Sequence, residues 1–284
     1  MIRLLRSEFR KIATTNIWWA FLLAVLGFTA LTFAINALQA HSYLHQPPLQ
    51  LPANIPPDQA AQIRADYQAR GTLVVQAANL YTSGQYFGLL FVLLLGILVV
   101  TNEYFHQTAT TTFLATPRRT MVIAGKLSVM VLAAVGLCLA TTVLCVIAGA
   151  IFLSAEGASL ALGEWAVTRA LLLNLLAYAI WAVFGVGFGT LIRNQLAAVI
   201  VAIALYLVGS SIASAIIQLI AIVTHAIWLT KLTVAVPSVA SQVMITGADL
   251  PGNPPQWLGA AVLIGYGVVA GGIGTLLTQR RDIG

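Results

Sequence analysis

The segment Val100–Lys126, VTNEYFHQTATTTFLATPRRTMVIAGK, is a long polar break between two apolar runs of this chain. Glu103 ends the first run, and a threonine-rich stretch follows it. Pro117, Arg118 and Arg119 come shortly before the second run. This layout fits a short helix that lies at the membrane surface between two spanning helices. It contains no recognisable set of catalytic residues.

The composition is typical of an integral membrane protein. The chain has 284 residues, of which 60% are apolar and 8% are charged, and its mean hydropathy is +0.92. Soluble domains, by contrast, are roughly one quarter charged. The formal net charge of +6 comes from cations scattered at the ends of apolar runs. These cations indicate membrane topology and argue against nucleic acid as a partner.

Six apolar runs are long enough to cross the membrane, because about 20 apolar residues span ~30 Å of hydrocarbon as a helix. We predict spans at 17–38, 85–101, 121–153, 166–192, 196–223 and 257–278. The third and fifth exceed the minimum length, so they should tilt, kink or project from the bilayer. Residues 39–84 and 224–256 are expected on the extracytoplasmic side, the latter as short helices that dip into the outer leaflet.

The distribution of cations predicts that both termini are cytoplasmic. With the N-terminus inside, Arg64, Arg70, Arg169 and Lys231 lie outside. The cytoplasmic side then holds the other ten Lys and Arg residues: Arg3, Arg6, Arg10, Lys11, Arg118, Arg119, Lys126, Arg193, Arg280 and Arg281. Cytoplasmic loops carry such an excess of positive residues. An even number of spans follows.

Residues 1–16 are predicted to form an interfacial amphipathic helix. Ile2, Leu5, Phe9 and Ile12 recur at helical spacing, and cations occupy the other face. A signal peptide is the competing interpretation. We do not favour it, because the following apolar stretch is too long and has no clear cleavage site.

Two further patterns are weak. His41 and His45 have the spacing i, i+4, which suits a metal, but no third ligand is evident, so a solvated loop is favoured. Cys138 and Cys145 are ~10 Å apart on a helix, too far for a disulfide with each other. They are interpreted as small packing residues.

Two glycine pairs predict close helix contacts, whereas the phosphate-binding and serine-hydrolase motifs are incomplete. Gly185 with Gly189, and Gly267 with Gly271, have the GxxxG spacing of close helix contacts, without indicating which helix is the partner. The Gly125–Lys126 pair lacks the first glycine and the hydroxyl of a phosphate-binding loop. Ser210, Ser211 and His225 lack a GxSxG frame, and the spans hold almost no acid for ion coupling. The chain is therefore not predicted to be an enzyme, and a transporter of this kind would need a separate motor.

The stretch 102–119, NEYFHQTATTTFLATPRR, resembles bacterial ABC-2 type transporter permeases. The basic amphipathic N-terminus, six spans and the proline-containing break before the last span are similar to the same family. The resemblance implies an all-α, type V exporter-like architecture, with one permease domain over residues 1–284. It also implies a bacterial plasma membrane location.

The family resemblance implies a separate ATPase subunit that binds ATP and Mg, so no cofactor or metal is expected in this chain. Two permeases, as a homodimer or a heterodimer, would assemble with two ATPases. Segment 102–119 would be the coupling helix in a cleft of the ATPase, and residues 1–16 the connecting helix. The expected interface residues are Asn102, Glu103, Tyr104, Phe105, Gln107, Thr108, Thr112, Phe113, Leu114, Arg118 and Arg119.

Glu103 is the main candidate for transmitting movement. A carboxylate at the hydrocarbon edge is costly unless paired, and Arg118, Arg119 or a partner's cation could pair with it. The alternative is an interfacial acid that snorkels to water. Phe113 and Leu114 are expected to form an apolar knob in the ATPase cleft, or else to be buried in the membrane interface.

The substrate is expected to be hydrophobic or amphipathic: a drug, a peptide or a lipid. The spans offer Phe87, Phe91, Trp181 and Phe184 with little fixed charge, although lipid-facing residues would give the same pattern. The rival function is a structural or immunity-type membrane protein without an ATPase, or a secondary carrier.

Overall fold

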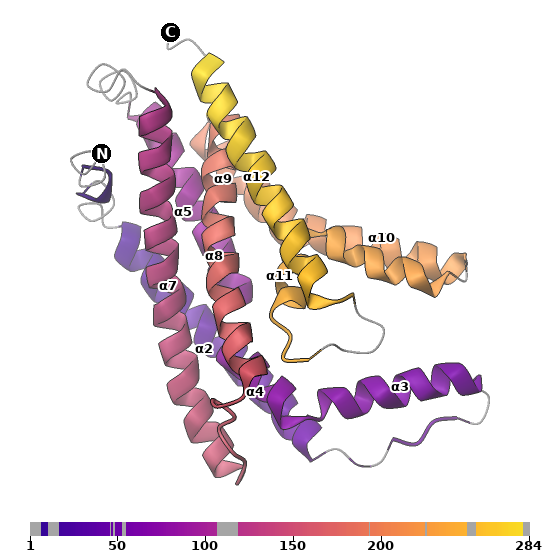
Figure 1. The fold of residues 1–284 in the computed structure, drawn as a ribbon. Helices are drawn as coiled ribbons and strands as arrows, with labels where there is room; N and C mark the ends of the chain where they lie inside the picture. Colours follow the sequence, from indigo (N-terminus) through magenta and orange to yellow (C-terminus); the bar gives the residue numbers. More distant parts are fainter. Residues whose placement is uncertain are drawn as a thin grey trace.

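The computed structural model of the chain is a bundle of long helices (Figure 1). It describes residues 7–10, 17–45, 47, 49–52, 55–106, 119–192, 194–224, 226–248 and 254–280. Within these ranges there is no β-strand, and six helices are long and apolar enough to cross a membrane. The chain is therefore a multi-pass, all-α membrane protein, as its composition predicts.

The long helices overlap the six predicted spans. They are α2 (Ile17–Leu44), α5 (Gln85–Phe105), α7 (Arg119–Ala155), α8 (Trp165–Leu191), the bent helix that joins α9 (Gln195–Ile203), η1 (Ala204–Gly209) and α10 (Ser210–Val223), and α12 (Gln256–Arg280). However, α2 continues six residues past its predicted end, and the second candidate span, Leu73–Phe105, begins twelve residues before its predicted start. A helix satisfies its own backbone groups, which is why long apolar segments adopt this form.

The bundle has two ends, which we name by the helices that stop there (Figure 1). The terminal end holds the end of α5 at Phe105, the start of α7 at Arg119 and the end of α12 at Arg280. The far end holds the end of α2 at Leu44 and the end of α7 at Ala155. Successive long helices therefore run in alternating directions.

Helix α5 is the buried centre of the bundle, and α8 packs directly along it. A Cβ atom added at Gly96 would lie 2.9 Å from the Cα atom of Gly185. One added at Gly189 would lie 3.0 Å from the carbonyl oxygen of Ile97. The GxxxG pair of α8 therefore faces α5, and its glycines allow the two backbones to approach closely.

Helix α12 packs on another face of α8. A Cβ atom at Gly267 would lie 2.9 Å from Ile180, and one at Gly271 would lie 3.2 Å from Val183. The second GxxxG pair therefore marks the contact between α12 and α8. In α7, both cysteines are buried and neither forms a disulfide, as their spacing predicts.

The segments between the spans contain shorter helices. In the predicted extracytoplasmic segment 39–84, α3 (Pro57–Arg70) is followed by α4 (Leu73–Tyr81). Helix α4 is largely buried among α2, α7 and α8, because its Val, Ala and Leu side chains continue the core. In segment 224–256, η2 (Ile227–Ala235) contacts α10, and α11 (Pro237–Met244) packs on α12 and α8.

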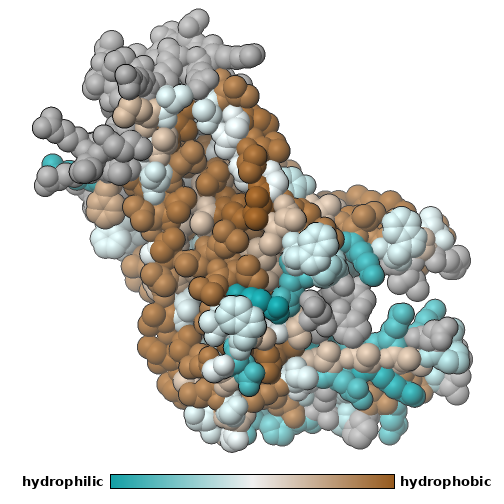
Figure 2. Space-filling model, in the orientation of Figure 1, coloured by the Kyte–Doolittle hydropathy of each residue, from teal (hydrophilic) through white to brown (hydrophobic). Residues whose placement is uncertain are grey.

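The fifth predicted span is bent. Helix α9 runs along the bundle, whereas α10 leaves it sideways (Figure 1). The two are joined by η1, a π-helical turn, and such turns are a common cause of kinks. The kink is one of the outcomes expected for a span of this length. Figure 2 shows hydrophobic residues over most of the visible bundle and hydrophilic residues gathered around α3.

Candidate functional site

A buried cluster of three charged side chains joins three elements at the terminal end. Glu8 lies in the helical residues Ser7–Arg10, Glu103 in the last turn of α5, and Lys126 near the start of α7. The ammonium Nζ of Lys126 lies 2.9 Å from Oε2 of Glu8 and 2.7 Å from Oε1 of Glu103. These residues are 2% (Glu8), 7% (Glu103) and 5% (Lys126) exposed. The cluster therefore fastens the N-terminal segment to α5 and α7.

Because its three charged side chains are buried, substitution of any one of them is expected to destabilise the protein. Moving a charged group out of water costs several kcal/mol, and an opposite charge with direct hydrogen bonds offsets that cost. Lys126 donates to a carboxylate on each side, and such charge-assisted hydrogen bonds are about twice as strong as neutral ones. Loss of one member leaves the others buried with a weaker set of partners.

The ion cluster stands at the base of the segment 107–118. Glu103 lies four residues before this segment and Lys126 eight residues after it, so their contact joins the end of α5 to the first turns of α7. Segment 107–118 itself lies outside the described residues. Of the predicted coupling helix, 102–119, residues 102–105 form the end of α5 and Arg119 begins α7.

The predicted interface residues that the structure describes occupy different environments. Glu103 is in the ion cluster, and Tyr104 packs against the bundle core. Phe105 is 70% exposed. Arg119 begins α7, but its side chain lies outside the described part. The remaining predicted positions lie outside the described residues: Gln107, Thr108, Thr112, Phe113, Leu114 and Arg118.

Asn102 connects α5 to α9. Its Oδ1 accepts a hydrogen bond of 2.9 Å from Nε2 of Gln195. Gln195 is held at this position because Asn194 caps α9, accepting a hydrogen bond of 3.0 Å from the backbone N–H of Ala197. Asn102 thus links α5 to α9 at the terminal end, a contact that the sequence did not predict.

Two members of the ion cluster were missed by the site prediction. In the sequence, Lys126 is interpreted as a topology signal and rejected as part of a phosphate-binding loop, and Glu8 is not singled out. The missed signal is a lysine inside the apolar run VIAGKLSVM, which needs a counter-charge. Glu8 is the single acid among residues 1–16, so it is a candidate counter-charge for Lys126. Arg118 and Arg119, the expected partners of Glu103, have no described side chains.

The surface next to the ion cluster is hollowed. A hollow of about 680 Å³ is lined by Tyr104 and Phe105 of α5 and by residues at the start of α9: Asn194, Gln195, Leu196 and Val199. Phe105 and Leu196 are both strongly exposed there. This part of the terminal end presents apolar side chains beside segment 107–118.

An apolar cavity of about 520 Å³ lies midway along the bundle, lined by parts of α8, η1, α10, α11 and α12. Two of its aromatic side chains donate hydrogen bonds to other groups of the protein. Trp181 Nε1 donates to Ser241 Oγ over 2.9 Å, and the Tyr206 hydroxyl donates to the Tyr86 carbonyl over 2.6 Å. Both side chains are buried, and their rings pack edge-to-face with centroids 5.1 Å apart.

The four aromatic residues considered for substrate contact separate into two groups. Trp181 and Phe184 line the apolar cavity. Phe87 and Phe91 instead pack against α2, where the ring centroids of Phe28 and Phe87 are 4.5 Å apart. The latter pair therefore serves helix packing.

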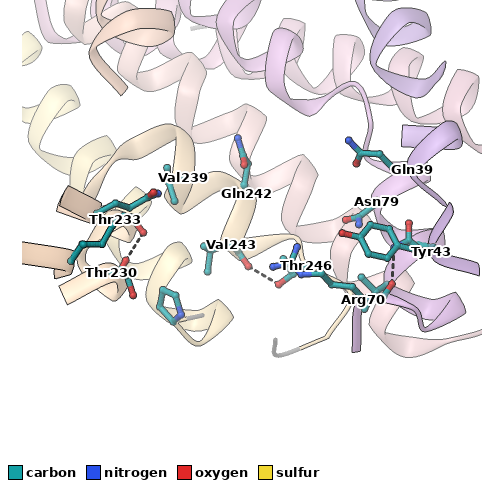
Figure 3. A pocket seen from close by; sticks show the side chains of 15 residues that line it. Gln39, Tyr43, Arg70, Asn79, Thr230, Thr233, Val239, Gln242, Val243 and Thr246 are labelled. Carbon is teal, nitrogen blue, oxygen red and sulfur yellow. Dashed lines mark hydrogen bonds between the residues drawn. The ribbon is translucent and has the colours of Figure 1, made fainter. Parts of the chain in front are cut away.

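A second cavity, of about 560 Å³, lies toward the far end and is lined largely by polar residues (Figure 3). Tyr43, Arg70 and Asn79 lie on one side of it, and Thr230 and Thr233 on the other (Figure 3). The Asp66 carboxylate accepts a hydrogen bond of 2.8 Å from Arg70 Nε, which raises the pKa of the Arg70 guanidinium. A fixed cation therefore stands at this cavity.

Helix α11 separates the two cavities. Pro237 and Ser238 line the apolar cavity, whereas Val239, Gln242 and Val243 line the polar one. Helix η2 also contributes residues to both cavities: Ala235 lines the apolar one, and Thr230 and Thr233 line the polar one. The two cavities are thus arranged in series along the bundle, with α11 between them.

No protein-family model matches this chain, and no curated protein matches it. Its function is therefore inferred from the residues and their geometry.

Proposed function

We propose that the chain is the membrane-spanning permease subunit of an ATP-binding cassette exporter, driven by a separate ATPase subunit. The observation that carries the proposal is the buried cluster of Glu8, Glu103 and Lys126. It ties residues 7–10 to the end of α5, which belongs to the most buried candidate span, and to the first turns of α7. These two helix ends flank segment 107–118 in the sequence. Segment 107–118 belongs to the stretch that resembles the coupling helix of ABC-2 type permeases.

The ion cluster supports a mechanical form of coupling. A force on segment 107–118 moves α5 and α7 together, because separating them would break the buried pair of Glu103 and Lys126. Helix α5 also carries Leu93, which lines the apolar cavity. Movement at the terminal end is thereby transmitted to the cavity wall. ATP binding by the partner subunits supplies the free energy that shifts the permease between its inward and outward states.

In this proposal the terminal end is cytoplasmic, which is the side where ATP is present. The excess of Lys and Arg residues at that end supports this orientation. The hollow lined by Phe105 and Leu196 provides apolar surface beside the docked ATPase. Two permeases and two ATPases form the complete transporter in a bacterial plasma membrane.

The two cavities form the proposed path through one permease. The apolar cavity has the volume of a typical small-molecule site, for which 300–1,000 Å³ is usual. Its mainly apolar lining favours a hydrophobic or amphipathic substrate. The polar cavity follows toward the far end, so α11 is the barrier that must move for the substrate to leave.

The experiment that tests the proposed function is co-purification of the tagged chain with the ATPase encoded by a neighbouring gene. ATP hydrolysis is then measured with the wild-type chain and with Glu103→Gln and Lys126→Met in nanodiscs. Glu164→Gln is the matched control, because Glu164 is exposed at the far end.

The proposal expects a stable complex and ATP hydrolysis that the wild-type chain stimulates. The two cluster variants should lose most of this stimulation, on the order of tenfold, while the control keeps it. If no ATPase associates, a structural protein or a secondary carrier becomes the better interpretation. If the cluster variants stimulate hydrolysis as well as the wild type does, the cluster does not transmit movement.

A further inference from the structure

Three metal-binding side chains meet at the far end of the bundle. His41 lies in the last turn of α2, His45 directly follows α2, and Glu156 directly follows α7. One donor atom from each residue lies within 4.8 Å of the other two. The structure thus supplies the third ligand that the spacing of the two histidines alone does not reveal.

The contacts within this trio are short. His41 Nδ1 lies 2.8 Å from Oε1 of Glu156, and His45 Nδ1 lies 3.6 Å from Oε2 of the same carboxylate. The two imidazole centroids are 4.7 Å apart. Residues at i and i+4 share a helix face, which explains why both imidazoles reach Glu156.

The backbone holds the trio in place. The N–H of Glu156 donates to the carbonyl of Phe152 over 3.0 Å, so its position extends the last turn of α7. The side chain of His45 donates through Nδ1–H to the carbonyl of His41 over 3.1 Å. In that tautomer Nε2 carries the lone pair, so this backbone contact orients the imidazole as a ligand.

Two imidazoles and one carboxylate form a ligand set that Zn²⁺ takes with a water molecule in the fourth position. Imidazole nitrogen also suits Cu²⁺ and Ni²⁺, whereas Ca²⁺ and Mg²⁺ prefer oxygen ligands. The side chains of His41 and His45 are 60% and 58% exposed, so a metal ion from solution can reach them. The Glu156 side chain is 15% exposed, and its negative charge faces both rings.

We propose that His41, His45 and Glu156 form a binding site for a divalent transition metal such as Zn²⁺. The bound ion links the far end of α2 to the far end of α7. This site shares no residue with the cluster at the terminal end, and it does not depend on the chain being a permease.

The test measures Zn²⁺ binding to the full chain in nanodiscs, purified through a tag that contains no histidine. Competition with a chromophoric zinc chelator gives the affinity and the stoichiometry. We expect one site per chain, and an affinity at least tenfold lower in His41→Ala, His45→Ala and Glu156→Gln. His106→Ala and Glu164→Gln serve as matched controls, because both residues are exposed and lie outside the trio.

Two further measurements support or overturn the site. Zn²⁺ should raise the melting temperature of the wild type but not of Glu156→Gln, a variant of nearly equal size whose folding is checked by gel filtration. Binding should weaken in acid, because protons compete with the metal ion for its ligands. The proposal is wrong if the wild type binds no Zn²⁺, or if the three variants bind it as tightly as the controls do.

Discussion

Lys126 contacts two acids, whereas Glu8 and Glu103 each share its single ammonium group. Lys126→Met therefore removes both of the ion pairs among the described residues of the cluster, whereas Glu103→Gln removes the pair with Lys126. Breaking a buried pair costs about 3–5 kcal/mol, so we expect Lys126→Met to be the most destabilising single change in the cluster. Thermal or denaturant unfolding in nanodiscs measures the difference.

Lys231→Met is the matched control for this prediction, because Lys231 is exposed on η2. Its free energy of unfolding should remain within about 0.5 kcal/mol of the wild-type value, as is usual for surface substitutions. A double-mutant cycle with Glu103→Gln and Lys126→Met should give a coupling of 0.5–3 kcal/mol, the range for residues in contact. Additive effects would show that Glu103 and Lys126 do not interact.

At the level of helices, the contact between α5 and α8 depends on glycine. A Cβ atom at Gly185 would lie 2.5 Å from the carbonyl oxygen of Leu93 and 3.1 Å from its Cα atom, and both are backbone atoms of α5. We expect Gly185→Ala to destabilise the protein by about 1–3 kcal/mol, the cost of overpacking. Thermal unfolding in nanodiscs measures it.

Gly136→Ala provides the comparison for Gly185→Ala. A Cβ atom at Gly136 would meet nothing within 4 Å, and this residue also lies in a long helix, α7. It should be neutral or slightly stabilising, because alanine favours the helix by about 1 kcal/mol over glycine. Equal effects at the two positions would contradict the close approach of α5 and α8.

The helices of this fold could be predicted from the sequence because hydropathy over 20 residues is a local property. Their partners could not. The GxxxG pairs indicate close contacts, but only the structure identifies α5 and α12 as the helices that meet α8. The burial of α4 likewise depends on α2, α7 and α8 being present around it.

The same distinction applies to both candidate sites. Glu103 was recognisable because an acid at the edge of an apolar run is unusual. Its cluster depends on a contact between Lys126 and Glu8, which are 118 residues apart in sequence. His41 and Glu156 are 115 residues apart. Helix periodicity carries no information about contacts of this kind.

For the whole molecule, the arrangement of two cavities in series predicts where a ligand binds. Ala213 lines the apolar cavity. Ala213→Trp should fill much of that volume and reduce the affinity for a hydrophobic fluorescent dye at least tenfold, measured by titration of the purified chain. Leu139→Trp is the control, because Leu139 is exposed on α7. Equal dye affinity in both variants would show that the dye binds elsewhere.

The orientation of the molecule can be tested with cysteines placed at its two ends. In a background with Cys138→Ala and Cys145→Ala, Glu164→Cys marks the far end and His106→Cys the terminal end, and both positions are exposed. In intact spheroplasts a membrane-impermeant maleimide should label position 164 at once and position 106 only after the membrane is opened. The expectation rests on the sequence prediction that the side with more Lys and Arg residues is cytoplasmic. Labelling in the reverse order would place segment 107–118 outside the cell, where ATP is scarce, and would remove the basis for an ATPase docked there.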